Sequence, residues 1–294
     1  MVMNMNNLEL FMKVAEKMSI TEASKELFIS QPAVSKAVKS LETHLNIKLF
    51  IRDKKNGLML TEGGKEILVL ARQMKSIENK IYQVANQENK LLSGKIKVGS
   101  FPAASTNILP KTLGLFRERY PFVNIELMEG TSNQIKKWVE DRTVDMGIVA
   151  SPFEPYEYKI LNNDHMVAII PDNHNLSQEK RVNLKKHQDD IIFCKGGHEI
   201  AISKAFETNN IKFKESLTVQ NAETLISMVK NDLGIGIISN FTLSSVSHNL
   251  ITKDINPSIT RDIGIITHSF KEVTPATSEF IKIIVSSYKA HYGN

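Results

Sequence analysis

The sequence has a single cysteine among its 294 residues, and this scarcity excludes two kinds of stabilising framework. One thiol cannot form an intrachain disulfide, and it cannot build a cysteine-rich zinc module. The eight histidines add no metal-binding spacing, because Ile202 stands where a second helical histidine would have to follow His198-Glu199. The sequence therefore predicts neither a disulfide-stapled fold nor a metal site.

Long apolar runs are also missing. The longest one, Met166–Pro171, is far shorter than the roughly 18 residues that a membrane-spanning helix needs. The first seven residues contain no basic side chain of the kind that begins a secretory signal. We therefore expect a cytoplasmic protein with no membrane partner, a compartment that also suits a lone thiol.

The familiar catalytic motifs are absent as well. The chain has no G-x-G-x-x-G fingerprint, no phosphate-binding P-loop and no G-x-S-x-G nucleophile motif, and Gly234-x-Gly236 is only a fragment of the first. An enzyme on a doubly wound fold is the alternative that these absences weigh against. We expect a protein that is not an enzyme and that uses no cofactor.

What is present is a globular composition with an uneven distribution of charge. Apolar residues make up 41% of the chain and charged residues 23%, and the length exceeds what one core usually organises, so two or more domains are expected. Residues 1–92 hold 14 Lys and Arg against 10 Asp and Glu, whereas residues 93–294 hold 23 against 22. This balance fits a polyanion-binding head on a neutral body, and it fits a mildly basic domain without such a partner equally well.

Three short helices are predicted in the first 45 residues. Apolar residues recur at helical spacing from Leu8 to Met18, and a second segment runs from Thr21 to Leu27. Ser30 is a favoured N-cap for the third helix, and Pro32 falls in its first turn, where a missing N–H costs nothing. A short helix, a tight turn and a second helix are typical of a helix-turn-helix.

The third helix has an apolar stripe and a polar, basic outer face. At 100° per residue, Val34, Val38 and Leu41 lie within about 60° of one another, which predicts a narrow buried stripe. The outer face and its flank carry Pro32, Ser35, Lys36, Lys39 and Thr43.

Two short extended runs follow around Asn56-Gly57, a dipeptide that favours a hairpin turn because both residues tolerate positive φ. The hairpin carries Arg52, Lys54 and Lys55, so we interpret it as a basic wing beside the third helix. Residues 1–60 are therefore predicted to form a winged helix-turn-helix domain.

Residues 61–92 predict one long helix of about 48 Å. Its apolar residues alternate at spacings of three and four, the pattern of a coiled-coil seam, and an exposed seam implies a partner helix. The seam residues are Ile67, Leu70, Met74, Ile77, Ile81 and Val84. Packing on the chain's own body is the alternative, which the polar opposite faces weigh against. We predict that this helix forms a dimer.

Beyond Gly94, strands and helices alternate in two successive sets, which predicts a body of two small doubly wound α/β lobes at residues 93–294. Lobe 1 is expected at about 93–162 and 268–294, and lobe 2 at about 163–267.

At this point the run at residues 21–50, TEASKELFISQPAVSKAVKSLETHLNIKLF, resembles the winged-helix head of LysR-type transcriptional regulators. The similarity continues through a G-x-I-x-V-G strand at Gly94–Gly99 and the glycine-rich turn at Leu233–Ile237, and it covers essentially the whole chain. Asp232 and Ser239 depart from the small residue and the proline that are common around that turn.

The resemblance implies a bacterial regulator of transcription that binds double-stranded DNA and is usually a homotetramer. It implies a periplasmic-binding-protein-like domain that senses a small molecule, and RNA polymerase is a possible further partner. It also places Gln31, Pro32, Ser35 and Lys36 toward the major groove.

For the DNA contacts we expect affinity from phosphates and specificity from base edges. Ser30 and the helix N-terminus suit a phosphate, Gln31 suits adenine and Pro32 a thymine methyl group. Lys39 suits backbone or bases, and the wing side chains suit the adjacent minor groove or its phosphates. The alternative is a merely solvated basic face.

A ligand of a two-lobed fold binds at the carboxyl ends of strands, near helix N-termini. The residues assigned to this effector site are Ser100, Phe101, Ala103, Ser105, Thr131, Ser132, Ser151, Lys195, Gly196 and Asn221. Hydroxyls, glycine N–H groups, a lysine and helix dipoles favour an anion such as a small carboxylate. Ser100 and Thr131 as mere helix caps, and Lys195 as a solvated side chain, remain alternatives.

Two other classes of protein fit the sequence less well. A stand-alone solute receptor would not carry residues 1–92, and a DNA-architectural protein would not need a body of about 200 residues. Cys194, beside Lys195, invites a redox role, but a second, resolving cysteine is absent, so a structural or cleft-lining role is favoured.

Overall fold

The computed structural model describes residues 4–292 except Asn56, 88–91, 195–198 and 213–216. It divides into two compact units, Met1–Ala85 and Asn86–Asn294. Within the described residues, no helix combines the length and the apolar character that crossing a membrane requires.

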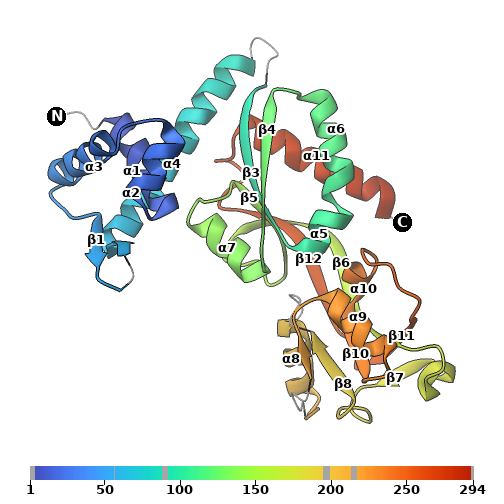
Figure 1. The fold of residues 1–294 in the computed structure, drawn as a ribbon. Helices are drawn as coiled ribbons and strands as arrows, with labels where there is room; N and C mark the ends of the chain where they lie inside the picture. Colours follow the sequence, from blue (N-terminus) through green and yellow to red (C-terminus); the bar gives the residue numbers. More distant parts are fainter. Residues whose placement is uncertain (1–3, 56, 88–91, 195–198, 213–216, 293–294) are drawn as a thin grey trace. The chain divides into compact units, whose positions relative to one another are not determined.

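The first unit consists of three short helices, a hairpin and the long helix (Figure 1). In chain order the elements are α1 (Met5–Lys17), α2 (Ile20–Leu27), α3 (Gln31–Leu45), β1 (Phe50–Asp53), β2 (Gly57–Leu60) and α4 (Glu62–Gln87). β1 and β2 pair antiparallel, with Asp53 opposite Gly57. The expected order of elements in the head is therefore the observed one.

Local signals account for where these helices begin and end. The Ser19 and Ser30 hydroxyls accept hydrogen bonds from backbone N–H groups in the first turns of α2 and α3. The three short helices each end in a left-handed residue, Met18, Phe28 and Asn46. A buried cluster that includes Phe11 and residues of α3 and α4 then joins the helices, so the start of α4 is part of the head.

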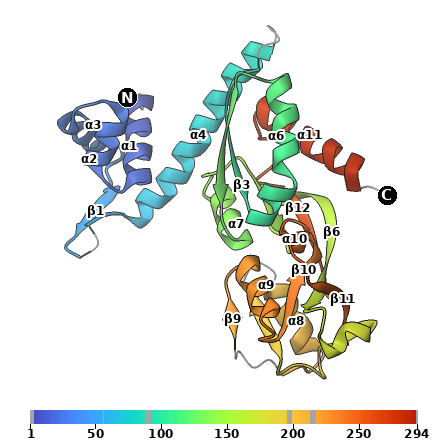
Figure 2. The ribbon, with the colours of Figure 1, turned by 45° about the vertical axis from the view of Figure 1, so that its right-hand side comes forward.

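The second unit is an α/β body with two lobes (Figures 1 and 2). Lobe 1 holds β3 (Gly94–Ser100), α5 (Pro102–Asn107), α6 (Leu109–Arg119), β4 (Val123–Glu129), α7 (Ser132–Glu140), β5 (Met146–Ala150), β12 (Thr260–Thr267) and α11 (Pro275–Tyr292). β6 (Glu157–Ile170) is shared. Lobe 2 holds η1 (Asn175–Gln178), β7 (Arg181–Asn183), β8 (Ile191–Cys194), α8 (Glu199–Thr208), β9 (Thr218–Val219), α9 (Ala222–Lys230), β10 (Ile235–Ser239), α10 (Asn240–Leu243) and β11 (Ile251–Asn256).

Each lobe is built on a mixed sheet. In lobe 1 the strand order is β4-β3-β5-β12-β6, with β3 parallel to both neighbours and β12 antiparallel to both of its own. In lobe 2, β10 lies between β6 and β8, and β11 pairs on the other edge of β6. The two-lobed α/β fold that we predicted is confirmed.

β6 explains how the lobes are connected. Its first part, Glu157–His165, pairs with β12 in lobe 1, and its last part, Met166–Ile170, pairs with β10 and β11 in lobe 2. The chain returns to lobe 1 just before β12, as the pairing of Ile263 of β12 with Ala150 of β5 indicates. Lobe 2 therefore ends near residue 259, one strand earlier than the expected boundary at residue 267.

The glycines at the start of β10 allow close packing of the backbone. Gly234 has φ +150°, and a Cβ atom there would lie 2.4 Å from the carbonyl oxygen of Asp190. A Cβ atom on Gly236 would meet Ile169 and Val229 at less than 3 Å. Both glycines are thus required for close packing between β10 and its neighbours.

Candidate functional site

The outer face of α3 is exposed as predicted. Ser30, Gln31, Pro32, Ser35, Lys36 and Lys39 are all solvent-exposed, while Val34, Ala37 and Val38 face the core. The Ser30 hydroxyl accepts a hydrogen bond from the Ala33 N–H. Pro32 lies in the first turn. The helix therefore presents a small, polar and basic surface to solvent.

The hairpin adds positive charge to the same unit. Arg52, Lys54 and Lys55 are exposed on it. Among the described residues, neither these side chains nor Lys36 and Lys39 take part in an ion pair, so their charges are available to a polyanion. Other lysines of the unit are compensated: Lys13 and Lys17 bind the Glu26 carboxylate and lower its pKa to about 2.

Phe28, which precedes Ile29 and Ser30, was not among the predicted functional residues. Its side chain is 96% exposed and its φ is +55°, which is uncommon for an aromatic residue. The sequence offers one signal for an exposed ring at this position: Phe28 is an apolar residue that follows directly after the amphipathic spacing of α2 ends.

The predicted seam on α4 lies mainly at the surface. Leu70, Met74, Ile77, Ile81 and Val84 are 36% to 63% exposed. Ile67 instead packs against the buried cluster of the head. The stripe beyond Ile67 is thus an apolar surface on one face of a long helix.

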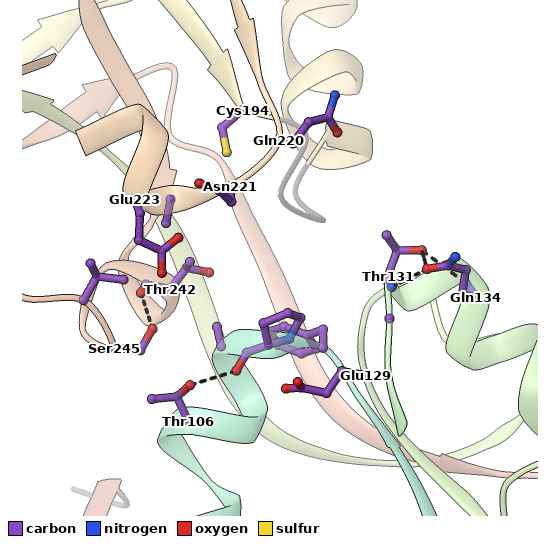
Figure 3. Close-up of a pocket in the computed structure, with 16 residues that line it drawn as sticks. Thr106, Glu129, Thr131, Gln134, Cys194, Gln220, Asn221, Glu223, Thr242 and Ser245 are labelled. Carbon is purple, nitrogen blue, oxygen red and sulfur yellow. Dashed lines mark hydrogen bonds between the residues drawn. The ribbon is translucent and has the colours of Figure 1, made fainter. Parts of the chain in front are cut away.

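A cavity of about 370 Å³ opens between the two lobes of the body (Figure 3). Lobe 1 contributes the start of α5 and the turn between β4 and α7, at residues 101–103, 106, 129–131 and 134. Lobe 2 contributes the end of β8, the start of α9 and the α10 region, at residues 194, 220–223, 242, 245 and 246. A molecule in this cavity would contact both lobes.

Four of the predicted effector residues line the cavity: Phe101, Ala103, Thr131 and Asn221. Thr131 and Asn221 are also the N-caps of α7 and α9, so the alternative that Thr131 caps a helix holds alongside its place in the cavity wall. Cys194 is buried at the same wall.

Four further predicted residues, Ser100, Ser105, Ser132 and Ser151, are described and do not line the cavity. The Ser100 hydroxyl is fully buried and donates to the Phe101 carbonyl, and the buried Ser105 hydroxyl oxygen has no partner in the described part of the chain. The Ser132 and Ser151 hydroxyls accept hydrogen bonds from the backbone N–H groups of Ala150 and Asp262. Lys195 and Gly196 lie outside the described residues.

Several residues that were not predicted as effector residues also line the cavity. Glu129, Gln134, Glu223, Thr242 and Ser245 line the wall. Their polarity was visible, but nothing local to each residue indicates that β4, α9 and α10 converge. Among the described residues, no three His, Cys, Asp or Glu side chains are grouped so that they could hold a metal ion.

A buried ion pair joins the strands that cross between the lobes. The Asp164 carboxylate of β6 accepts hydrogen bonds from Arg261 Nε at 2.9 Å, Ser239 Oγ at 2.6 Å and the Phe241 N–H at 3.0 Å. The Arg261 guanidinium lies 5.9 Å from the centre of the Phe101 ring, which lines the cavity. This cluster holds the start of α10 against β6 and β12. Thr242 of α10 is one of the residues that line the cavity.

Comparisons with known proteins agree on the family. The family described as "Bacterial regulatory helix-turn-helix protein, lysR family" matches residues 5–65, and "LysR substrate binding domain" matches residues 89–289. The uncharacterized HTH-type transcriptional regulator YoaU of Bacillus subtilis (strain 168) is 69% identical over 285 residues, which cover 97% of this chain and 98% of that protein.

Solved structures show the same fold. A full-length OxyR variant from Pseudomonas aeruginosa has a TM-score of 0.77 at 20% identity, and the alignment covers 98% of this chain and 95% of the OxyR chain. Full-length CbnR, solved in complex with its target DNA, has a TM-score of 0.64 at 18% identity, and the alignment covers 97% of this chain and 100% of the CbnR chain.

A helix-turn-helix head followed by a two-lobed substrate-binding domain defines a DNA-binding regulator of transcription rather than an enzyme. The chain belongs to the LysR family, as its resemblance at residues 21–50 predicted.

Proposed function

We propose that this LysR-family regulator binds promoter DNA in a sequence-specific manner and that a small molecule in the interlobe cavity changes the strength or geometry of that binding. The observation that carries the proposal is the cavity itself, because its walls come from both lobes. Occupancy would favour one relative position of the lobes, and a ligand shifts an equilibrium by its differential affinity for the two states.

The exposed face of α3 supports the reading of bases. Gln31 and Ser35 present an amide and a hydroxyl, Pro32 an apolar edge, and Lys36 and Lys39 positive charge. The exposed wing residues are suited to phosphates. In this proposal α3 enters the major groove and the wing follows the adjacent backbone.

The apolar stripe on α4 supports a dimer. Half-exposed aliphatic side chains at heptad spacing are stabilised when a partner helix covers them. Two heads would then read two half-sites. A tetramer through body-to-body contacts, contact with RNA polymerase and a cytoplasmic location are proposed from the family alone.

For the effector we propose a small molecule that carries a carboxylate. The first backbone N–H groups of α7 and α9 lack intrahelical partners and carry positive partial charge. Thr131 and Asn221 place both helix starts at the cavity. No metal or organic cofactor is part of the proposal.

DNA binding is tested by fluorescence anisotropy on a promoter fragment and a scrambled duplex. Ser35→Ala should reduce the preference for the promoter, whereas Lys54→Ala should weaken binding to both duplexes. In a dimer, Lys54→Ala removes two phosphate contacts, so the slope of log K against log salt should fall by about two. Lys185→Ala, an exposed lysine of lobe 2, is the charge-matched control. Equal losses on both duplexes for Ser35→Ala would contradict base reading.

The effector role is tested by repeating the promoter titration with and without candidate carboxylates. Thr106→Trp places a large side chain in the cavity at an exposed position of α5, so it should abolish the response while leaving promoter binding intact. A response that persists unchanged in Thr106→Trp would refute the cavity as the effector site.

A further inference from the structure

The charged side chains that are described in the interlobe cavity all carry the same sign. Among its described lining residues, Glu129 and Glu223 are the charged side chains, and both are acidic. They come from opposite lobes: Glu129 ends β4, and Glu223 lies in the first turn of α9. Figure 3 shows Glu223 extending from the start of α9 toward the open space, with Glu129 beside the start of α5 across from it.

Neither carboxylate has a partner within the described chain. Glu129 and Glu223 make no ion pair and no side-chain hydrogen bond there. By contrast, Glu126, on the same strand as Glu129, forms an ion pair with Lys95 of β3. Both cavity carboxylates are exposed, so water solvates them while the cavity is empty.

A ligand that fills the cavity changes this situation, because it removes water from both carboxylates. A charge that loses its hydration without gaining a partner costs several kcal/mol. A purely anionic ligand would add repulsion from two sides to that cost. A ligand with a positively charged hydrogen-bond donor would compensate both carboxylates instead.

We propose that the effector carries an ammonium group that binds between Glu129 and Glu223 and bridges the two lobes. The inference rests on the proposed effector function and narrows its chemistry: together with the carboxylate proposed for the helix N-termini, it describes an amino-acid-like zwitterion. An ammonium has three donors, and the cavity offers acceptors beyond the two carboxylates, such as the Ser245 hydroxyl and the Gln220 amide.

The residues present favour an ammonium over a metal ion. The described chain groups no three His, Cys, Asp or Glu side chains so that they could hold a metal ion, and two carboxylates alone are a poor ligand set for a bound cation. An amine also fits a wall on which Phe101, Pro102 and Ala103 supply apolar surface for the rest of a small molecule. The volume of about 370 Å³ lies within the range of ordinary small-molecule sites.

The test uses matched probes on the full-length protein. Each amino acid is paired with the acid that lacks its amine: glutamate with glutarate, leucine with 4-methylpentanoate, phenylalanine with 3-phenylpropanoate. The twenty standard amino acids extend the set, putrescine tests amines without a carboxylate, and Mg²⁺ tests a metal ion. Thermal shift screens the probes, and calorimetric titration measures Kd for those that bind.

The proposal expects at least one amino acid to bind at least tenfold more tightly than its deaminated partner. Glu129→Gln and Glu223→Gln should each weaken that binding by about tenfold or more, the loss typical of a charged hydrogen bond. Glu126→Gln in lobe 1 and Glu207→Gln in lobe 2 are matched controls, since both positions are outside the cavity, and should leave Kd unchanged. Thermal unfolding of each variant without ligand checks that it folds.

The outcomes separate this inference from the proposed function. If a deaminated acid binds as tightly as its amino acid, the site takes an anion and the ammonium is refuted while the effector site stands. Binding of Mg²⁺ that Glu223→Gln abolishes would also refute it. If no probe of any kind binds, both the ammonium and the small-molecule role of the cavity are refuted.

Discussion

Asp164 lies where β6 passes from lobe 1 into lobe 2, and we expect its replacement by alanine to destabilise the body strongly. Its side chain is 1% exposed and that of its partner Arg261 is 3% exposed. The carboxylate accepts three hydrogen bonds, from Arg261, Ser239 and the Phe241 N–H. Asp164→Ala removes all three acceptor contacts and leaves a buried guanidinium without its counter-charge.

The size of the effect follows from this burial. Breaking a buried ion pair by removing one partner costs about 3–5 kcal/mol. In a unit of about 200 residues each kcal/mol lowers Tm by about 2–4 °C, so the transition of the body should move down by about 6–20 °C. Because the lost contacts hold Ser239 and Phe241 at the start of α10, Asp164→Ala should also weaken any ligand of the cavity.

The control is another aspartate with an ion pair at the surface. Asp254 of β11 lies 3.5 Å from Arg181, and its side chain is 60% exposed. Asp254→Ala should cost no more than about 1 kcal/mol, because water screens the pair. Differential scanning calorimetry of the full-length variants measures both. A Tm for Asp164→Ala that equals that of Asp254→Ala would refute the reasoning.

Two further predictions concern the head and its long helix. Ile77→Asp places a charge in the seam of α4 and should raise the dimer dissociation constant by at least tenfold in sedimentation equilibrium, whereas Tyr82→Asp, off the seam, should not; equal effects would contradict the seam. The hydrogen bonds of Lys13 and Lys17 to Glu26 lower the pKa of its carboxyl from 4.5 to about 2. Their stabilisation is therefore present above about pH 4.5 and is lost as pH falls toward 2. In circular-dichroism melts, Glu26→Gln should flatten this part of the pH profile, and an unaltered profile would contradict the pair.

The head was predictable because its signals are local. The Ser30 cap, Pro32 in the first turn and the apolar spacing of Val34 and Val38 all act within a few residues of one another. The structure places each element close to where these signals put it. What local signals could not show is the exposed Phe28 ring, since exposure depends on which surfaces the three helices cover.

The body was predictable in class and less so in detail. The short helices α5 and α10 have too few residues to show a helical period, and they were not predicted; nor was the strand β11. The lobe boundary depended on β12, whose Ile263 pairs with Ala150 more than a hundred residues earlier in the chain. Apolar alternation predicts a strand, but it does not choose the neighbour of that strand.

By itself, the sequence determined the family, the order of elements in the head, the exposed basic face of α3 and the apolar stripe of α4. Thr131 and Asn221 were found because each lies where a predicted strand ends and a predicted helix begins, and both boundaries have local signals. Which other residues line the cavity was decided by the tertiary structure alone. Ser132 and Ser151 bind backbone groups of neighbouring strands, while Glu129 and Glu223 line one cavity from opposite lobes because two sheets share β6. Which distant residues come to line one cavity depends on strand pairing, and pairing is a property of the whole fold.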